Sequence, residues 1–336
     1  MSDSIQHDDA LHDPDRIGRA TEPSRTFRRA LVFGATGQIG DALLPLLYAK
    51  GVAVRAVSRR PQPAADAPGL QWIRSDLEQA NLEPANSGSA DSYGSDRSEG
   101  CALLPRDCDV IFSLGPLDAF ARWQDRAGPI APRVVAFGST SVRTKDASTD
   151  HAERELATRL RAAEDSLLAF GARHRIAVSI LRPTLVYGCG RDRTLSRIAA
   201  LARRHGVFML PSSAIGLRQP VHVDDLAAAA VACARQAQCA DRAYDVPGGE
   251  AVGYREMVSR VLGSLQPKPR LLTVPDWLFR ATVRVANALG TLGDAGRGVV
   301  DRLDQDLVFD ADPAHRDFGY APRAFQCDRA MFGSGQ

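Results

Sequence analysis

Three glycines, each three residues from the next, lie between an apolar run and a helix-forming stretch near the start of the chain. The segment is Arg29-Ala-Leu-Val-Phe-Gly34-Ala-Thr-Gly37-Gln-Ile-Gly40. Gly34 permits a tight turn out of a strand, Gly37 lets a pyrophosphate approach the backbone, and Gly40 lets the helix pack closely on the sheet. The amino end of that helix also favours an anion. The pattern predicts a dinucleotide-binding turn, the alternative being a similar turn without a ligand. The expected contact residues are Gly34, Thr36, Gly37, Gln38, Ile39 and Gly40.

Charge at the end of the second predicted strand indicates which dinucleotide is bound. The strand at residues 52–57 is followed by Ser58-Arg59-Arg60, with no acidic residue before Asp66. Sites that prefer NAD usually place an acid there for the ribose 2′-hydroxyl. A hydroxyl and two guanidinium groups suit a 2′-phosphate instead. We therefore expect NADP, with NAD less favoured; the alternative is a basic surface turn.

Apolar runs alternate with helix-forming stretches over the first half of the chain. We expect strands at residues 29–33, 52–57, 70–74, 109–113, 133–137 and 176–181, and helices at residues 39–50, 117–127 and 150–171. Asp150 and Glu153 open the last helix as a variant of the capping box. Apolar strands that alternate with helices are typical of a parallel sheet covered on both faces. We predict an α/β fold, a Rossmann-type doubly wound parallel sheet with a smaller C-terminal α/β substrate subdomain.

The chain is expected to divide into three parts. Residues 1–24 are polar and lack apolar periodicity, so we expect a disordered tail. Residues 25–190 would form the NAD(P)-binding Rossmann domain, with a flexible insertion at residues 83–100. Residues 191–330 would form mainly the substrate subdomain, with residues 219–236 packing back on the Rossmann core. Helices are expected in this last part at residues 194–205, 224–236, 254–265, 276–289 and 298–306, and short strands at residues 207–210 and 271–274.

The composition argues against several classes of protein. Of the 336 residues, 44% are hydrophobic and 24% are charged, which is ordinary for a globular chain able to bury a core. A formal net charge of +2 does not favour nucleic acid or an anionic membrane as the partner. The six cysteines lack metal-ligand spacing, and no metal is expected. There is no apolar leader or membrane-spanning run, so we expect a cytoplasmic protein.

Five segments, taken in order along the chain, resemble the extended short-chain dehydrogenase/reductase superfamily, in its branch of epimerases and dehydratases. They are the glycine turn, Ser75-Asp76-Leu77, Phe137-Gly-Ser-Thr-Ser-Val142, Leu181-Arg-Pro-Thr-Leu-Val-Tyr-Gly188 and Gln219-Pro-Val-His-Val-Asp-Asp-Leu226, and the resemblance runs from about residue 29 to 325. It implies that Asp76 and Leu77 flank the adenine. Leu114-Gly115-Pro116 would lie along the ribose and pyrophosphate of the cofactor.

The catalytic residues are where this chain departs from the superfamily. The resemblance implies a catalytic Ser or Thr at Thr140 or Ser141, although these hydroxyls could equally bond their own backbone. It also implies a Tyr-x-x-x-Lys pair on the next helix, where tyrosine moves a proton while hydride moves at the nicotinamide. If Glu164 is the glutamate that the superfamily places four residues after the lysine, the Tyr and Lys positions hold Leu156 and Leu160.

Leucine cannot transfer a proton, so the usual relay cannot operate. Four nearby residues could replace the lost acid, although each is more simply a solvated loop or helix-start residue. They are His151, Lys145, Arg143 and Arg154.

Basic residues after the sixth strand suggest an anionic substrate. In open parallel sheets, ligands bind beyond the carboxyl ends of the strands. The resemblance implies that this region grips the phosphates of a nucleotide-sugar; the alternative is a solvated basic helix face. The candidate substrate residues are Arg182, Thr184, Arg191, Arg193 and Arg218.

Two functions are compatible with these features. The first is an NADP-dependent oxidoreductase or a nucleotide-sugar-modifying enzyme of the epimerase/dehydratase type, with an altered proton relay. The alternative is a non-catalytic NADP-binding sensor or scaffold, which the loss of both Tyr and Lys would favour. The balanced charge argues against nucleic-acid binding. Because the free face of the helix at residues 150–171 is crowded with charge, we expect a monomer or weak homodimer.

Overall fold

The computed structural model describes residues 26–60, 68–78, 104–146, 148, 150–192, 194–288, 302–328 and 330–332. The expected tail at residues 1–24 and the expected insertion at residues 83–100 lie outside the described residues, as does Arg193.

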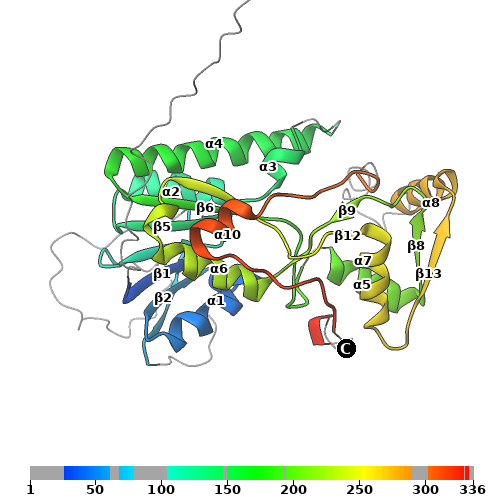
Figure 1. Cartoon of the computed structure of the whole chain (residues 1–336), viewed down its shortest axis with the longest axis horizontal. Helices are drawn as coiled ribbons and strands as arrows, with labels where there is room; N and C mark the ends of the chain where they lie inside the picture. The colour runs from blue at the N-terminus through cyan, green and yellow to red at the C-terminus, as the bar shows by residue number, and fades with distance from the viewer. Residues whose placement is uncertain are drawn as a thin grey trace, which may run out of the picture.

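Seven parallel strands form the central sheet (Figure 1). They are β1 (Arg29–Phe33), β2 (Ala53–Ser58), β3 (Leu70–Arg74), β4 (Val110–Ser113), β5 (Arg133–Phe137), β6 (Ala177–Pro183) and β11 (Arg242–Val246). Their spatial order is β11-β6-β5-β4-β1-β2-β3, and every neighbouring pair is parallel. The first six strands follow the 3-2-1-4-5-6 order of a doubly wound sheet. The predicted α/β fold is confirmed, and β11 is a strand that the sequence reasoning missed.

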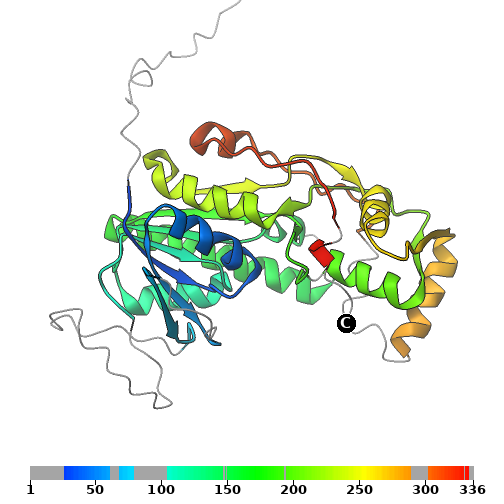
Figure 2. The ribbon, with the colours of Figure 1, turned by 90° about the horizontal axis from the view of Figure 1, so that it is seen from below.

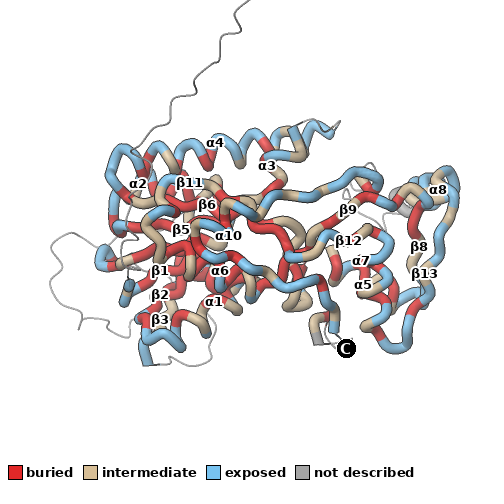
Figure 3. Tube along the Cα trace, in the orientation of Figure 1, coloured by how far each residue is buried: buried red, intermediate tan, exposed pale blue. Residues whose placement is uncertain are grey.

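Helices cover both faces of the sheet. α1 (Gln38–Ala49), α6 (Val223–Arg235) and α10 (Asp312–Phe318) lie on one face, and α2 (Leu117–Ala127) and α4 (His151–His174) on the other (Figure 1). Alternate residues of each strand enter the two cores, so Val32 packs beneath α1 while Phe33 packs against Trp123 of α2, with ring centroids 4.5 Å apart. The strands are buried along most of their length (Figure 3).

A second region lies beside the sheet in both ribbon views (Figures 1 and 2). It contains α5 (Leu195–His205), α7 (Tyr254–Gly263), α8 (Asp276–Ala288), and the parallel pair β8 (Val207–Pro211) and β13 (Arg270–Val274). A third apolar core, which includes Leu195, Met257 and Leu262, joins α5 to α7. α6 packs against α1, on the sheet side of the molecule. The boundary near residue 190 stays a prediction.

The remaining elements of the described chain are short. They are α3 (Ser141–Thr144), β7 (Val186–Tyr187), β9 (Leu217–Arg218), β10 (Val221–His222), β12 (Val252–Gly253), and the 3₁₀ turns η2 (Ala237–Cys239) and η3 (Ala330–Phe332).

The prediction of a helix at residues 298–306 is wrong for its described part, because residues 302–306 form a turn and bends and no helix. Their backbone bonds to other segments instead: Gly216 donates to the Leu303 carbonyl, and Arg218 donates to those of Arg302 and Gln305.

Candidate functional site

The glycine turn has the geometry that a dinucleotide requires. Gly34 has a φ of +73°, which favours glycine, and a Cβ there would lie 3.0 Å from the Gly115 nitrogen. A Cβ on Gly40 would lie 2.2 Å from the Ala35 carbonyl oxygen, so only glycine lets α1 begin this close to the turn. Gly37 caps α1 without a side-chain hydrogen bond, which leaves the amino end of the helix open toward an anion.

The residues expected to contact the adenosine half of the cofactor lie next to this turn. The hydroxyl oxygens of Thr36 and Ser58 are 2.9 Å apart, and the Arg60 amide donates to the Ser58 hydroxyl over 3.1 Å. Arg59 is 81% exposed, and its Nε lies 3.9 Å from the Asp76 carboxylate. The guanidinium of Arg59 is therefore accessible to a phosphate.

The loop after β4 completes this surface. Leu114 and Gly115 lie against Gly34, and the side chain of Leu77 is 3.6 Å from the position of a Gly115 Cβ. Pro116 caps the start of α2. The structure thus brings together the three segments that the sequence reasoning assigned to the cofactor. A narrow glycine-lined cradle beside an open helix terminus fits a dinucleotide.

Arg191 lies over the glycine turn. Its guanidinium donates to the Thr36 carbonyl over 3.1 Å and forms an ion pair with Asp41 in the first turn of α1. Nearby, the Cys189 thiol donates to the Gln38 side chain over 3.6 Å. Arg191 is thus positioned beside the cofactor turn, whereas the sequence reasoning assigned it to the substrate.

A cavity of about 260 Å³ opens beyond the carboxyl ends of β5 and β6, where the sheet meets the second region. Both regions contribute polar and apolar side chains to its wall. The lining residues are Ser139, Thr140, Ser141, Thr144, Lys145, Thr184, Leu185, Thr194, Arg218, Gln219, Tyr254, Arg302, Leu303, Leu307 and Phe309. In parallel sheets this is the end at which ligands bind.

The hydroxyls after β5 differ in what they can bind. Thr140 is buried, and its hydroxyl donates to the Pro183 carbonyl over 3.2 Å. Ser139 donates to the Ser141 hydroxyl over 3.1 Å, and both serines line the cavity. Ser141 therefore suits a substrate contact better than Thr140. Ser139 was not predicted, although its place two residues after β5 could have indicated it.

The helix that carries the Tyr-x-x-x-Lys pair in the superfamily is apolar here at those positions. Glu164 of α4 is buried and accepts from the Arg182 Nε at 2.9 and 3.1 Å, which fixes α4 against β6. Leu160 and Leu156 lie one and two turns earlier on the same face, and Leu160 packs against the apolar core. Among the described residues, this face of α4 offers no proton donor at either position.

Two predicted substrate residues have their polar groups engaged. Arg182 is held between Glu164 and Asp245, whose carboxylate lies 3.7 Å away. Burial opposes the charge of Arg182, yet its hydrogen bond and ion pair with Glu164 raise its pKa. The Thr184 hydroxyl donates to the Gln219 carbonyl. Arg182 therefore serves as a tie between α4, β6 and β11 in this structure.

Arg218 and Tyr254 form the floor of the cavity. Arg218 is 6% exposed and donates to the carbonyls of Leu217 and Gln305, over 2.8 and 2.6 Å. Its guanidinium lies 5.2 Å from the centre of the Tyr254 ring, a cation–π contact. Burial lowers the pKa of Arg218 and raises that of Tyr254. The Arg218 guanidinium is hydrogen-bonded to carbonyl oxygens and pairs with no carboxylate of the described chain. This buried cation can therefore attract an anion.

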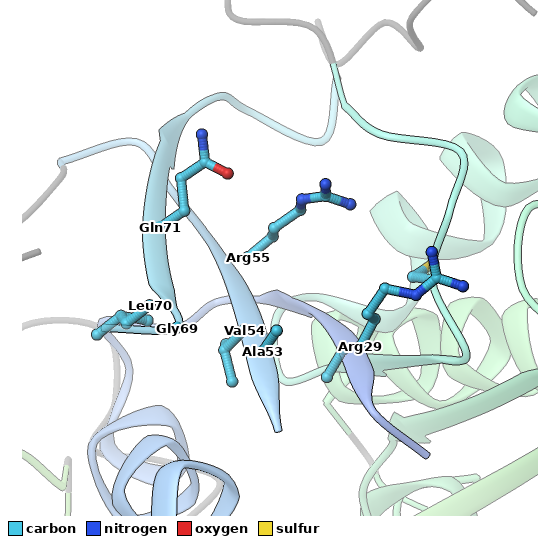
Figure 4. Close-up of a pocket in the computed structure, with 9 residues that line it drawn as sticks. Arg29, Ala53, Val54, Arg55, Gly69, Leu70 and Gln71 are labelled. Atoms are coloured by element: carbon cyan, nitrogen blue, oxygen red, sulfur yellow. The ribbon is translucent and has the colours of Figure 1, made fainter. Parts of the chain in front are cut away.

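A second cavity, of about 240 Å³, lies at the opposite end of the sheet (Figure 4). It opens at the amino ends of β1, β2 and β3, from which Arg29, Arg55 and Gln71 extend. Asp107 already pairs with both arginines, at 2.8 and 2.5 Å. With its cations neutralised and at the end of the sheet where ligands do not usually bind, this cavity is not the candidate site.

No group of three or more His, Cys, Asp or Glu side chains is arranged to hold a metal ion within the ranges that the structure describes. None of the helices in those ranges has the length and apolar character needed to span a bilayer.

Relatives and solved structures agree with this fold. No protein-family model matches the chain. A 2-alkyl-3-oxoalkanoate reductase of Stenotrophomonas maltophilia strain K279a is 26% identical over 330 residues, which cover 88% of this chain and 95% of the reductase.

Two solved structures have a similar fold. MoeE5 in complex with UDP-glucuronic acid and NAD matches with a TM-score of 0.61 and 23% identity, over 88% of this chain and 94% of MoeE5. UDP-glucuronic acid 4-epimerase of Bacillus cereus, in complex with NAD, matches with a TM-score of 0.60 and 13% identity, over the same shares of the two chains. This chain has the epimerase/dehydratase fold. The predicted resemblance is confirmed.

Proposed function

We propose that this protein is a nicotinamide-dinucleotide-dependent oxidoreductase with an altered proton relay, and that it reduces the carbonyl group of a small anionic substrate. One observation carries the proposal. A cavity lined by serine and threonine hydroxyls, Lys145 and the buried Arg218 lies at the carboxyl ends of β5 and β6, the end of the sheet that also holds the glycine turn.

The cofactor would lie on the glycine turn and the loop after β4. Gly34, Gly37 and Gly40 would admit its pyrophosphate, and Arg191, which is paired with Asp41, would lie beside it. Ser58, Arg59 and Arg60 would bind a 2′-phosphate, which supports NADP over NAD. When bound, the reduced cofactor supplies hydride to the substrate carbonyl carbon.

The charge of the cavity supports an anionic substrate. Lys145, Arg218 and Arg302 line it, while Leu303, Leu307 and Phe309 give it an apolar wall. The volume of about 260 Å³ suits a small acid better than a nucleotide-sugar, because pockets for drug-sized ligands span about 300–1,000 Å³. The name of the Stenotrophomonas relative supports a 3-oxo acid. A nucleotide-sugar is the second candidate, supported by the UDP-glucuronic acid complex of MoeE5.

The test combines cofactor binding with turnover. NADPH and NADH are titrated while nucleotide fluorescence is followed. NADPH consumption is then measured with acetoacetate and 2-methyl-3-oxobutanoate, and NAD⁺ reduction with UDP-glucose. We expect tighter binding of NADPH than of NADH, and turnover of a 3-oxo acid. Turnover of UDP-glucose alone would favour the nucleotide-sugar candidate. Tight NADPH binding without any turnover would favour the non-catalytic sensor, and failure to bind either nucleotide would refute both.

A further inference from the structure

One ammonium group lies in the cavity wall close to the serine hydroxyls. Lys145 follows α3 directly, and its backbone amide donates to the Ser141 carbonyl over 3.1 Å, so the two residues are one helical turn apart. The Lys145 side chain is 20% exposed and lines the same cavity as Ser139 and Ser141. The loop after β5 therefore places hydroxyls and an ammonium group on one wall.

The other three residues that the sequence suggested as replacement acids do not reach the cavity. Arg143 forms an ion pair with Asp245 over 2.8 Å. Arg154 donates to the Ser148 carbonyl over 2.5 Å, and His151 is exposed at the start of α4. None of the three lines the cavity. Of the four residues that the sequence suggested as replacement acids, the structure brings only Lys145 to the candidate site.

Glu153 holds the Lys145 ammonium group in place. Its carboxylate lies 3.4 Å from the Lys145 Nζ, pairs with Arg302, and accepts from the Ser148 hydroxyl over 2.7 Å. Burial favours the neutral acid, yet the hydrogen bonds from Arg302 and Ser148 and the charges of Arg302 and Lys145 hold the pKa of Glu153 below its ordinary value. The ionised carboxylate therefore holds the Lys145 ammonium group at the cavity wall through an ion pair.

Lys145 retains hydrogen-bonding capacity for a substrate. An ammonium group has three N–H donors. Within the described ranges, the only side-chain partner of the Lys145 Nζ is Glu153. Glu153 itself is shared with a second cation, Arg302, so this cluster carries a net positive charge beside the cavity. At least one N–H remains for an oxygen atom bound near Ser141.

We propose that Lys145 is the proton donor of this protein, so that an ammonium group from the loop after β5 replaces the tyrosine that α4 lacks. The assignment rests on the proposed reduction of a carbonyl substrate.

Hydride transfer and proton transfer together reduce the carbonyl group to an alcohol. The carbonyl carbon gains a hydride and is reduced, at the expense of the reduced nicotinamide dinucleotide that the proposed function requires. The carbonyl π electrons move to oxygen, an O–H bond forms, and an N–H bond of Lys145 breaks. Lys145 is left as a neutral amine and regains its proton from water. Ser141 donates a hydrogen bond to the same oxygen and positions it.

Kinetics of paired variants test the assignment. Lys145→Arg keeps a positive charge beside Glu153, but guanidinium does not release a proton at neutral pH. We expect kcat for the 3-oxo acid that the wild type reduces, acetoacetate or 2-methyl-3-oxobutanoate, to fall by about 100-fold, at the low end of general-acid effects. The KM and the NADPH Kd should stay within about threefold. Lys268→Arg, at an exposed position, is the matched control. A Lys145→Arg enzyme with unchanged kcat would show that the ammonium group is structural and would overturn the proposal.

A second readout needs no turnover. The chain has three lysines, Lys50, Lys145 and Lys268. Reductive methylation with ¹³C-formaldehyde labels each, and the signal missing from the Lys145→Arg variant is that of Lys145. NADP⁺ plus the same 3-oxo acid cannot react, because both are oxidised. We expect this mixture to shift the Lys145 signal and leave the other two in place. An unmoved Lys145 signal would overturn the assignment even if kcat falls.

Failure of the proposed function would look different. If the wild type binds NADPH but reduces neither acid, the oxidoreductase proposal fails and the role of Lys145 fails with it. If the wild type reduces an acid and Lys145→Arg does so equally well, only the role of Lys145 fails.

Discussion

Replacing Gly40 by alanine should damage both the fold and cofactor binding. A Cβ at this position would lie 2.2 Å from the Ala35 carbonyl oxygen and 2.6 Å from its carbonyl carbon. These are backbone atoms of the glycine turn, so they cannot move aside as the end of a flexible side chain could. The first turn of α1 and the glycine turn must therefore separate.

The magnitude follows from two opposing terms. Overpacking costs about 1–3 kcal/mol, and we take the upper end because the clash is with backbone. Alanine in place of glycine in a helix recovers up to about 1 kcal/mol. The free energy of unfolding should therefore fall by about 2 kcal/mol. NADPH binding should weaken by at least about tenfold, because the amino end of α1 no longer faces the turn.

Gly263→Ala is the matched control. Gly263 ends α7, and a Cβ there would meet nothing within 4 Å. This variant should be unchanged or more stable by up to about 1 kcal/mol. Urea unfolding followed by circular dichroism measures the stability of each variant, and nucleotide fluorescence measures NADPH binding. If the two alanine variants unfold at the same urea concentration and bind NADPH equally, the close approach of α1 to the turn is not what Gly40 provides.

Three further predictions concern ion pairs and cofactor choice. Glu164→Gln leaves the buried Arg182 guanidinium without its main partner and should lower the free energy of unfolding by about 3 kcal/mol in urea. Replacing Arg59 with Asp and Arg60 with Ala should weaken NADPH binding by about tenfold or more and leave NADH binding nearly unchanged in a fluorescence titration, because only NADPH carries the 2′-phosphate. The pKa of Glu153 is lowered from its ordinary value of 4.5, so its ion pairs stabilise the fold at pH values above 4.5. In urea titrations at several pH values, the difference in unfolding free energy between wild type and Glu153→Gln should therefore narrow as the pH falls below 4.5.

Each of these predictions has its own control. Asp165→Asn removes an exposed carboxylate next to Glu164, and equal losses from the two variants would contradict a buried ion pair. Lys50→Ala removes a cation beyond the far end of α1, and should not alter the ratio of NADPH to NADH affinity. For Glu153, a stability gap that stays constant down to low pH would show that its carboxylate is not held by Arg302 and Lys145.

The parts of the fold that were predicted depend on neighbours along the chain. The spacing of Gly34, Gly37 and Gly40 sets the local backbone path of the turn. The strands β1 to β6 are apolar runs, and such runs predict buried strands. β11 was missed because Arg242-Ala-Tyr-Asp-Val carries two charged residues in five, and they are tolerated only at the edge of the sheet beside β6.

Local patterns also misjudged residues whose partners are remote in sequence. Asp150 caps α4 as predicted, by accepting from the Ala152 amide over 2.9 Å. The predicted capping box is nevertheless incomplete, because Glu153 turns toward Lys145 and Arg302 instead of back to Asp150. The segment at residues 302–306 likewise depends on the distant strand β9.

The sequence by itself predicted the cofactor turn and the absence of the Tyr-Lys pair, because both are statements about residue types at fixed short spacings. Only the tertiary structure decided which polar groups remain available. It bonded Arg182 to Glu164 and Thr140 to Pro183, set Arg191 against Thr36 across 155 residues of chain, and left Lys145 in the cavity wall. The physical reason is that a charged or hydroxyl group can act on a ligand only with the hydrogen-bonding capacity that its protein partners leave unused, and those partners are brought together by folding.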